Sequence, residues 1–316
     1  MTFTPAPWAR GPHLQTIIPT FYPVFGPEPA SRILDVPVAP ETKVRTLVSV
    51  GAGKGTIVLI HGLGGCASGV YMLRTARAAL ARGWSVVRMN LRNCGGTERM
   101  AKTLYNAGQS DDLARVLEAM SEARLPRPFA VIGFSLGGNL ALRYAGVAED
   151  ASMADAVVGV NPPVDLARCM DALERPANRP YHFYFRAKLI AQIRAIRKVR
   201  EVPGPEVSWR TVRGVRGFDD VFTAPDAGLA DSAAYYRHAS SGPILDRIRR
   251  PTLILSAADD PFVPVSMFPA WNGSASHLRF LHPKTGGHCG YWASSSPRYW
   301  AAEAALQFLD SPENRP

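Results

Sequence analysis

Three side chains far apart in the sequence have the types that nucleophilic acyl transfer requires. Ser135 is the central residue of GFSLG, Asp260 closes the run PTLILSAADD, and His288 lies in KTGGHCGYW. A serine hydroxyl is a weak nucleophile, so it needs a base within hydrogen-bond reach and an acid that orients the base. We therefore predict a triad in which Ser135 attacks, His288 transfers the proton and Asp260 orients His288.

The residues around Ser135 strengthen this prediction. A Val/Ile run, PFAVIGF, precedes the serine, and an Ala/Leu pattern typical of a helix, LGGNLALRYAG, follows it. A G-x-S-x-G segment between a strand and a helix is a nucleophile elbow, whose sharp turn requires small flanking residues. The oxyanion formed during acyl transfer needs two N–H donors. We assign them to the backbone of Leu136 and of Leu63, in the loop HGLGG.

Other carboxylates are alternatives to Asp260 as the acid of the triad. Asp259 is adjacent to Asp260, and we prefer Asp260 because its spacing to Val263-Pro264 is usual for such loops. Asp259, one residue earlier, stays an alternative to Asp260 as the acid. Asp165 follows another predicted strand and is a weaker alternative in a variant architecture.

The remaining polar motifs are expected to be structural. Asp219 and Asp220 are expected to stabilise the loop that joins a cap insertion to the core of the protein. His61 is expected to support the loop HGLGG. The glycine-rich stretch 51–55 lacks the G-x-x-x-x-G-K-[ST] pattern of a phosphate-binding loop and precedes a strand, so we interpret it as a turn.

The elements that must position these residues alternate in type. Short apolar runs predict strands, and helical periodicity between them predicts a mainly parallel sheet with helices on both faces. The predicted strands are residues 56–62, 84–92, 128–135, 155–163, 251–260 and 277–283, and the predicted helices are residues 71–80, 111–125, 136–146 and 298–310.

The alternation breaks in the middle of the chain, which predicts an insertion. We expect residues 166–240 to form a cap over the carboxyl edge of the sheet. Residues 1–40 are expected to form an N-terminal arm on a core made of residues 41–165 and 241–316. Within the cap, residues 183–200 read as a basic amphipathic helix whose apolar face packs on the core. That face comprises Phe183, Leu189, Ile190, Ile193 and Ile196.

Composition and charge limit the class of protein. The 316 residues carry a formal net charge of +10, and residues 181–216 hold nine Lys or Arg against two Glu. These cations form either a solvated face or a surface for transient contact with anionic lipid. No segment resembles a nucleic-acid recognition module. The sequence shows neither an apolar run of about 20 residues, as a membrane span needs, nor a signal peptide, so we expect a cytoplasmic protein.

Cofactor chemistry is not indicated. Cys66, Cys94, Cys169 and Cys289 are scattered without a C-x-x-C pair, which predicts small buried residues, not a disulfide framework or a zinc site. The proposed triad requires no metal and no organic cofactor.

Several segments together resemble one known family. They include GPHLQTIIPTFY (11–22), NLRNCGGTE (90–98), NPPVDL (161–166) and FDDVFTAPDAGLADSAAYYRHAS (218–240). With the motifs above, they are similar to the YheT-like branch of the α/β-hydrolase superfamily, also called the AB hydrolase 4 family. The resemblance covers nearly the whole chain and implies an α/β-hydrolase fold with Ser135, Asp260 and His288 as the triad.

The resemblance also implies a substrate class. Members act as carboxylesterases, acylglycerol lipases or medium-chain phospholipases, and some transfer acyl groups to alcohols. We expect no N-terminal membrane anchor of the kind that the eukaryotic members carry, and we expect the chain to be closer to the bacterial members. We therefore expect a serine hydrolase whose partner is a small acyl ester, of short to medium chain length or an acylglycerol. Acyl transfer or thioester cleavage at the same site, and a non-catalytic binding protein, are the alternatives; no oligomeric state is predicted.

Overall fold

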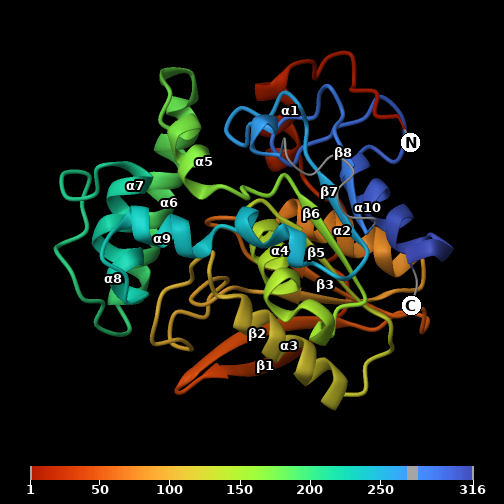
Figure 1. Cartoon of the computed structure of the whole chain (residues 1–316), viewed down its shortest axis with the longest axis horizontal. Coiled ribbons are helices and arrows are strands. Elements are labelled where there is room, and N and C mark those ends of the chain that lie inside the picture. Colours follow the sequence, from red (N-terminus) through yellow and green to blue (C-terminus); the bar gives the residue numbers. More distant parts are fainter. Residues whose placement is uncertain (1, 269–276, 315–316) are drawn as a thin grey trace.

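Eight strands form one sheet at the centre of the computed structural model, which describes residues 2–268 and 277–314 (Figure 1). Their order across the sheet is β1-β2-β4-β3-β5-β6-β7-β8. The strands are β1 (Arg32–Ala39), β2 (Thr42–Ser49), β3 (Thr56–Ile60), β4 (Ser85–Met89), β5 (Phe129–Phe134), β6 (Ala156–Val160), β7 (Thr252–Leu255) and β8 (Leu278–Leu281). Neighbours from β4 to β8 pair in parallel, as the alternation of strands and helices predicts.

The sequence did not predict two strands of this sheet. β1 and β2 form an antiparallel hairpin, and β2 pairs antiparallel with β4. Their sequences, RILDVPVA and TKVRTLVS, mix charged and apolar residues, because an outer hairpin is covered less completely than the central strands. Pro37 is tolerated in β1 because this strand lies at the edge of the sheet.

Helices cover both faces of the sheet (Figure 1). On one face, α2 (Val70–Ala81) and α10 (Trp300–Asp310) bury their apolar residues against one side of the strands. On the other, α3 (Ser110–Glu122) and α4 (Leu136–Ala148) pack in the larger apolar cluster. The fully buried sequences of β3 to β7 follow from this arrangement, since both faces of each strand are removed from water.

Five helices lie between β6 and β7 and gather beside one end of the sheet (Figure 1). They are α5 (Leu166–Leu173), α6 (Arg179–Arg197), α7 (Gly214–Phe218), α8 (Ala224–Asp226) and α9 (Ser232–Ala239). The predicted basic amphipathic helix is α6, and Leu189, Ile190, Ile193 and Ile196 are buried as expected. Phe183 was wrongly placed on that buried face. It is 61% exposed and stacks on Trp209, because at helical periodicity it lies at the margin of the arc that carries the four buried residues.

One further helix, α1 (Pro12–Phe21), was not predicted from the sequence. It contacts α2 and has Pro19 within it. Only Gln15, Thr16 and Pro19 are buried, so its pattern is not that of an ordinary amphipathic helix with an apolar inner face. Its buried face carries polar side chains, and their partners lie in the active-site loop described below.

Candidate active site

Ser135 lies in the sharp turn between β5 and α4. Its φ of 53° and ψ of −122° are unusual for a residue with a side chain. A Cβ atom at Gly133 would lie 2.1 Å from the carbonyl oxygen of Gly137, and one at Gly137 would lie 2.5 Å from the carbonyl oxygens of Ile60 and His61. Only glycine fits at both positions, which explains the spacing of the G-x-S-x-G motif.

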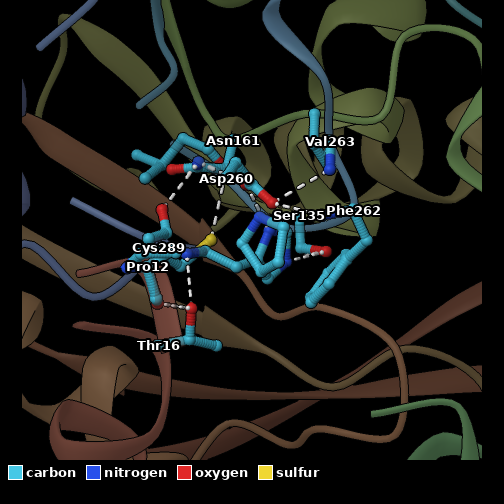
Figure 2. Close-up of polar contacts among 12 residues, drawn as sticks. Pro12, Thr16, Ser135, Asn161, Asp260, Phe262, Val263 and Cys289 are labelled. Atoms are coloured by element: carbon cyan, nitrogen blue, oxygen red, sulfur yellow. Dashed lines mark hydrogen bonds and ion pairs between the residues drawn. The ribbon is translucent and has the colours of Figure 1, made fainter. Parts of the chain in front are cut away.

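A continuous chain of hydrogen bonds joins the three predicted catalytic side chains (Figure 2). The Ser135 Oγ lies 2.8 Å from His288 Nε2, and His288 Nδ1 lies 2.7 Å from Asp260 Oδ2. The side chains come from loops after β5, β7 and β8, whose carboxyl ends meet at one edge of the parallel sheet. An Nδ1 proton bonded to the carboxylate leaves Nε2 free to accept the serine proton.

The surroundings of His288 favour its charged form. Burial disfavours the imidazolium and lowers the His288 pKa, but the charge and hydrogen bond of Asp260, together with Cys289, outweigh burial, so the net shift of the pKa is upward. The face of the ring contacts Phe262, with ring centroids 4.1 Å apart. An imidazolium formed during proton transfer would therefore be stabilised by a carboxylate in a water-poor setting.

The competing acids lie elsewhere or contact other groups. Asp259 Oδ1 accepts the Gly287 N–H at 2.9 Å and so supports the loop beside His288. Asp165 caps the start of α5, where its side chain accepts the Arg168 N–H.

The two acids of the 218–240 block make contacts among the inserted helices. Asp219 accepts a hydrogen bond from the Tyr236 hydroxyl at 2.7 Å. Asp220 accepts the Ser232 N–H at 2.8 Å. Both connect the segment after α7 to the region of α9, so they stabilise this part of the chain internally.

The two predicted oxyanion donors flank the serine. Leu136 begins α4, where a helix leaves its first N–H groups without an intrahelical acceptor. Leu63 follows Gly62, and a Cβ atom at Gly62 would lie 3.0 Å from the Ser135 Cβ. Within residues 2–268 and 277–314, neither the Leu63 nor the Leu136 N–H donates to another protein group. Both amides are therefore available to an oxyanion.

Side chains fix the loop that carries Leu63. The Gly62 N–H donates to the Tyr71 hydroxyl, and the Gly64 N–H donates to the Tyr105 hydroxyl, each at 3.0 Å. His61 is fully buried, accepts the Leu91 N–H at Nε2 and donates from Nδ1 to the Gly62 carbonyl oxygen. Burial lowers the His61 pKa to about 4, so this ring stays neutral. Through these contacts His61 supports the backbone of the loop, as expected from the sequence.

Asn161 is a site residue that the sequence reasoning did not single out. Its Nδ2 donates to Asp260 Oδ2 at 2.6 Å and to the Gly287 carbonyl oxygen at 3.2 Å, while its Oδ1 accepts the Tyr291 hydroxyl proton. Asn161 thus links the acid to the loop of His288 (Figure 2). A signal existed in the sequence, because Asn161 is a polar residue near the end of the predicted strand 155–163 and opens the segment NPPVDL.

A cavity of about 320 Å³ opens onto Ser135 and His288. Its walls are mostly apolar, include eight Phe or Tyr side chains, and come from the core, from α6 and from α1. The apolar lining includes Ile17, Tyr71, Phe134, Tyr181, Phe185 and Phe262. Such a lining suits an apolar group of a ligand, whose polar end would lie at the serine.

The described residues show neither a metal-binding cluster nor a membrane-spanning helix. No group of three or more His, Cys, Asp or Glu among them could hold a metal ion. Nor does the described part of the chain contain a helix long and apolar enough to cross a bilayer. The four cysteines are free thiols; Cys94 and Cys169 are buried as expected, but Cys66 and Cys289 are only half-buried.

Known proteins share both the sequence pattern and the fold. Residues 55–294 match the family described as having the α/β hydrolase fold. YheT of Escherichia coli, a protein named as an esterase, is 34% identical over 78% of this chain and 74% of its own length. The monoacylglycerol lipase of Saccharomyces cerevisiae is 27% identical over 81% of this chain, but the match spans only 59% of that protein.

Two further similarities concern a more distant relative and a solved structure. The human phospholipase ABHD3 is 26% identical over 77% of this chain and 60% of its own length. The crystal structure of the Pyrococcus furiosus esterase Pf2001 superimposes with a TM-score of 0.62 over 98% of this chain and 97% of that chain, at 14% sequence identity. At this identity the structural likeness concerns the fold alone.

Proposed function

The chain belongs to the YheT-like branch of the α/β-hydrolase family and is an ester-hydrolysing enzyme, and from this premise we propose that it cleaves acyl esters through an acyl-enzyme on Ser135. One observation carries the proposal. The hydrogen-bonded series Ser135–His288–Asp260 lies at the wall of an apolar cavity, and beside the nucleophile are two N–H groups that donate to no group in the described part of the chain.

The proposed reaction has two half-reactions that use the same groups. Ser135 Oγ attacks the ester carbonyl carbon while His288 Nε2 takes the serine proton, and the Leu63 and Leu136 N–H groups bind the oxyanion. His288 then gives this proton to the leaving alcohol, and the acyl group stays on Ser135. Water enters, gives a proton to His288 and attacks the acyl carbon. The carboxylic acid leaves, and the proton returns to Ser135.

The cavity supports acyl esters with an extended apolar group. Its aromatic lining offers few hydrogen-bond partners away from Ser135, so an acyl chain fits it better than a sugar or a peptide. The relatives named as a monoacylglycerol lipase and a phospholipase favour lipid-derived esters. We propose short- to medium-chain acyl esters or acylglycerols. Residues 166–240, the proposed cap, supply Tyr181 and Phe185 to the cavity and would set the chain-length preference.

A series of p-nitrophenyl esters from acetate to palmitate tests the proposal. Wild type should show a maximum of activity at one chain length, and Ser135→Ala should lose it at every length. Labelling with a fluorophosphonate should stop in the same variant. Activity retained by Ser135→Ala would refute the nucleophile, and absence of both activity and labelling in wild type would favour a binding protein. Products formed with added ethanol separate hydrolysis from acyl transfer.

We also propose transient contact with anionic lipid at the cavity mouth. Leu14, Ile17 and Phe21 lie three and four residues apart on α1 and are 45%, 42% and 67% exposed. Ile17 and Phe21 also line the cavity, as does Tyr184 of α6. Residues 181–216, which include most of α6, hold nine cations against two acids, and each cation near an anionic surface contributes about 1 kcal/mol.

Vesicle flotation tests this contact. Binding is expected to phosphatidylglycerol vesicles at low salt but not to phosphatidylcholine vesicles, because the attraction depends on charge and is screened by salt. Phe21→Ser should weaken binding. Val147→Ser is the matched control, since Val147 is 54% exposed at the far end of α4. Equal binding by both variants, or none by wild type, would refute the surface.

A further inference from the structure

The loop that carries His288 is held by the N-terminal helix α1, which lies about 270 residues earlier in the chain. The buried polar side chains of α1, Gln15 and Thr16, both contact this loop. Gln15 Oε1 accepts the Trp292 N–H at 2.7 Å, and Gln15 Nε2 donates to the Trp292 carbonyl oxygen at 3.2 Å. These contacts join α1 to the backbone of the loop four residues after the catalytic histidine.

Thr16 makes the contact closest to the chemistry. Its hydroxyl donates to the Pro12 carbonyl oxygen at 2.7 Å and accepts the backbone N–H of His288 at 2.9 Å (Figure 2). The one hydroxyl proton is used toward Pro12, so a lone pair of the oxygen faces the His288 N–H. Because both partners are backbone groups, their positions define the rotamer of Thr16.

The loop and the helix also fit tightly together. A Cβ atom at Gly287 would lie 2.5 Å from the Pro12 carbonyl oxygen and 2.7 Å from Thr16 Oγ1. A Cβ atom at Gly290 would lie 1.6 Å from the Gln15 carbonyl oxygen. Glycine on both sides of His288 lets the loop approach α1 closely enough for the Thr16 hydrogen bond.

The loop requires such support because its backbone is strained. Cys289 and Tyr291 have φ values of 58° and 45°, in the left-handed region that residues with side chains rarely adopt. Residues in such conformations persist only when the surrounding structure holds them. The contacts with α1 act directly on this stretch.

We propose that Thr16 is a positioning residue, whose hydroxyl holds the His288 backbone so that Nε2 stays in reach of the reacting oxygen in both half-reactions. The inference rests on the proposed function. In the free enzyme the His288 ring has two anchors, Ser135 Oγ and Asp260 Oδ2. In the acyl-enzyme the serine oxygen has become part of an ester and has no proton to donate. The only hydrogen bond that the ring then keeps is the one to Asp260. The hydrogen bond from the His288 backbone N–H to the Thr16 hydroxyl therefore matters most in deacylation.

The test compares two variants of Thr16 with one control variant. Thr16→Val keeps the shape but removes the hydroxyl, and Thr16→Ser keeps the hydroxyl. Thr46→Val is the matched control, because it removes the hydroxyl of another buried threonine, which donates to the Leu34 carbonyl oxygen at 2.9 Å within the β1–β2 hairpin and lies outside the lining of the cavity. Burst kinetics on a p-nitrophenyl ester measure acylation and deacylation separately, and the burst size counts folded active sites.

Thr16→Val should lower kcat by roughly ten- to a hundredfold, with a burst close to one product per site, because small misplacements of catalytic groups have effects of this size. Thr16→Ser and Thr46→Val should stay within a few-fold of wild type. Wild-type turnover by Thr16→Val, an equal loss in Thr46→Val, or a loss only of burst size would overturn the inference. If Ser135→Ala kept the burst of wild type, the proposed function itself would fail first.

Discussion

Replacement of Asp260 by asparagine has an effect that can be worked out from the hydrogen bonds around the carboxylate. Oδ1 accepts the N–H groups of Phe262 and Val263, at 3.0 and 2.9 Å. Oδ2 accepts from Asn161 Nδ2 at 2.6 Å and from His288 Nδ1 at 2.7 Å. Four donors thus face one carboxylate. Asparagine has nearly the same shape but replaces one oxygen with an NH₂ group, so no orientation satisfies all four.

We expect His288 to be the donor that loses its acceptor in this variant. Two backbone N–H groups point at Oδ1, so the asparagine oxygen takes that place and its NH₂ group faces Asn161 and His288. His288 can pair with this NH₂ only by carrying its proton on Nε2, with Nδ1 as acceptor. A proton on Nε2 prevents the ring from accepting the Ser135 proton. We expect kcat to fall about 10⁴-fold with KM little changed, the size of effect known for a triad histidine in the wrong tautomer.

Hydrolysis of the preferred p-nitrophenyl ester measures this loss, and thermal unfolding verifies that the variant is folded. Asp259→Asn is the matched control, because an asparagine oxygen at residue 259 can still accept the Gly287 N–H that Asp259 Oδ1 accepts at 2.9 Å. It should stay within a few-fold of wild type. The reasoning is refuted if Asp260→Asn keeps activity within about tenfold of wild type, or if Asp259→Asn is the variant that loses it.

Three further changes have defined outcomes. Gly62→Ala adds a methyl group 3.0 Å from the Ser135 Cβ, so the loop must shift and kcat should fall about tenfold or more in ester kinetics; an unchanged kcat would contradict the tight fit. Tyr71→Phe removes the acceptor of the Gly62 N–H, so kcat should fall roughly three- to tenfold, and unaltered kinetics would show that the loop does not need this bond. Burial raises the Asp219 pKa from 3.8 to about 6, so the native state holds a proton that the unfolded chain releases, and the stability contribution of this group falls as pH rises across that window. In Asp219→Asn the Tyr236 hydroxyl can still donate to the amide oxygen, so the melting temperature of the variant relative to that of wild type should rise between about pH 4 and pH 6. A difference in melting temperature that does not change with pH would argue against this titration.

The sequence alone determined the features that depend on short segments. The buried runs of β3 to β7 could be recognised because a strand covered on both faces is almost wholly apolar. The elbow around Ser135 could be recognised because its turn excludes side chains at Gly133 and Gly137, whatever the rest of the fold. The order of Ser135, Asp260 and His288 along the chain, each after a strand of one parallel sheet, was sufficient to expect them at one edge.

Only the tertiary structure decided which groups meet there. Asp259 and Asp260 are neighbours in an irregular turn, and the direction of each side chain depends on the Phe262 and Val263 amides and on the Gly287 amide. The hydrophobic periodicity that predicts helices and strands does not predict the direction of side chains in such a turn.

The contacts of Thr16 and Asn161 with the His288 loop could not be inferred from spacing either. They join segments 272 and 126 residues apart, and α1 and β1 lie where the pattern of apolar residues is weak. Local sequence specifies a turn or a strand through sterics and burial. The partners of a polar side chain are chosen by the packing of distant segments, because each buried donor must find an acceptor in the folded molecule.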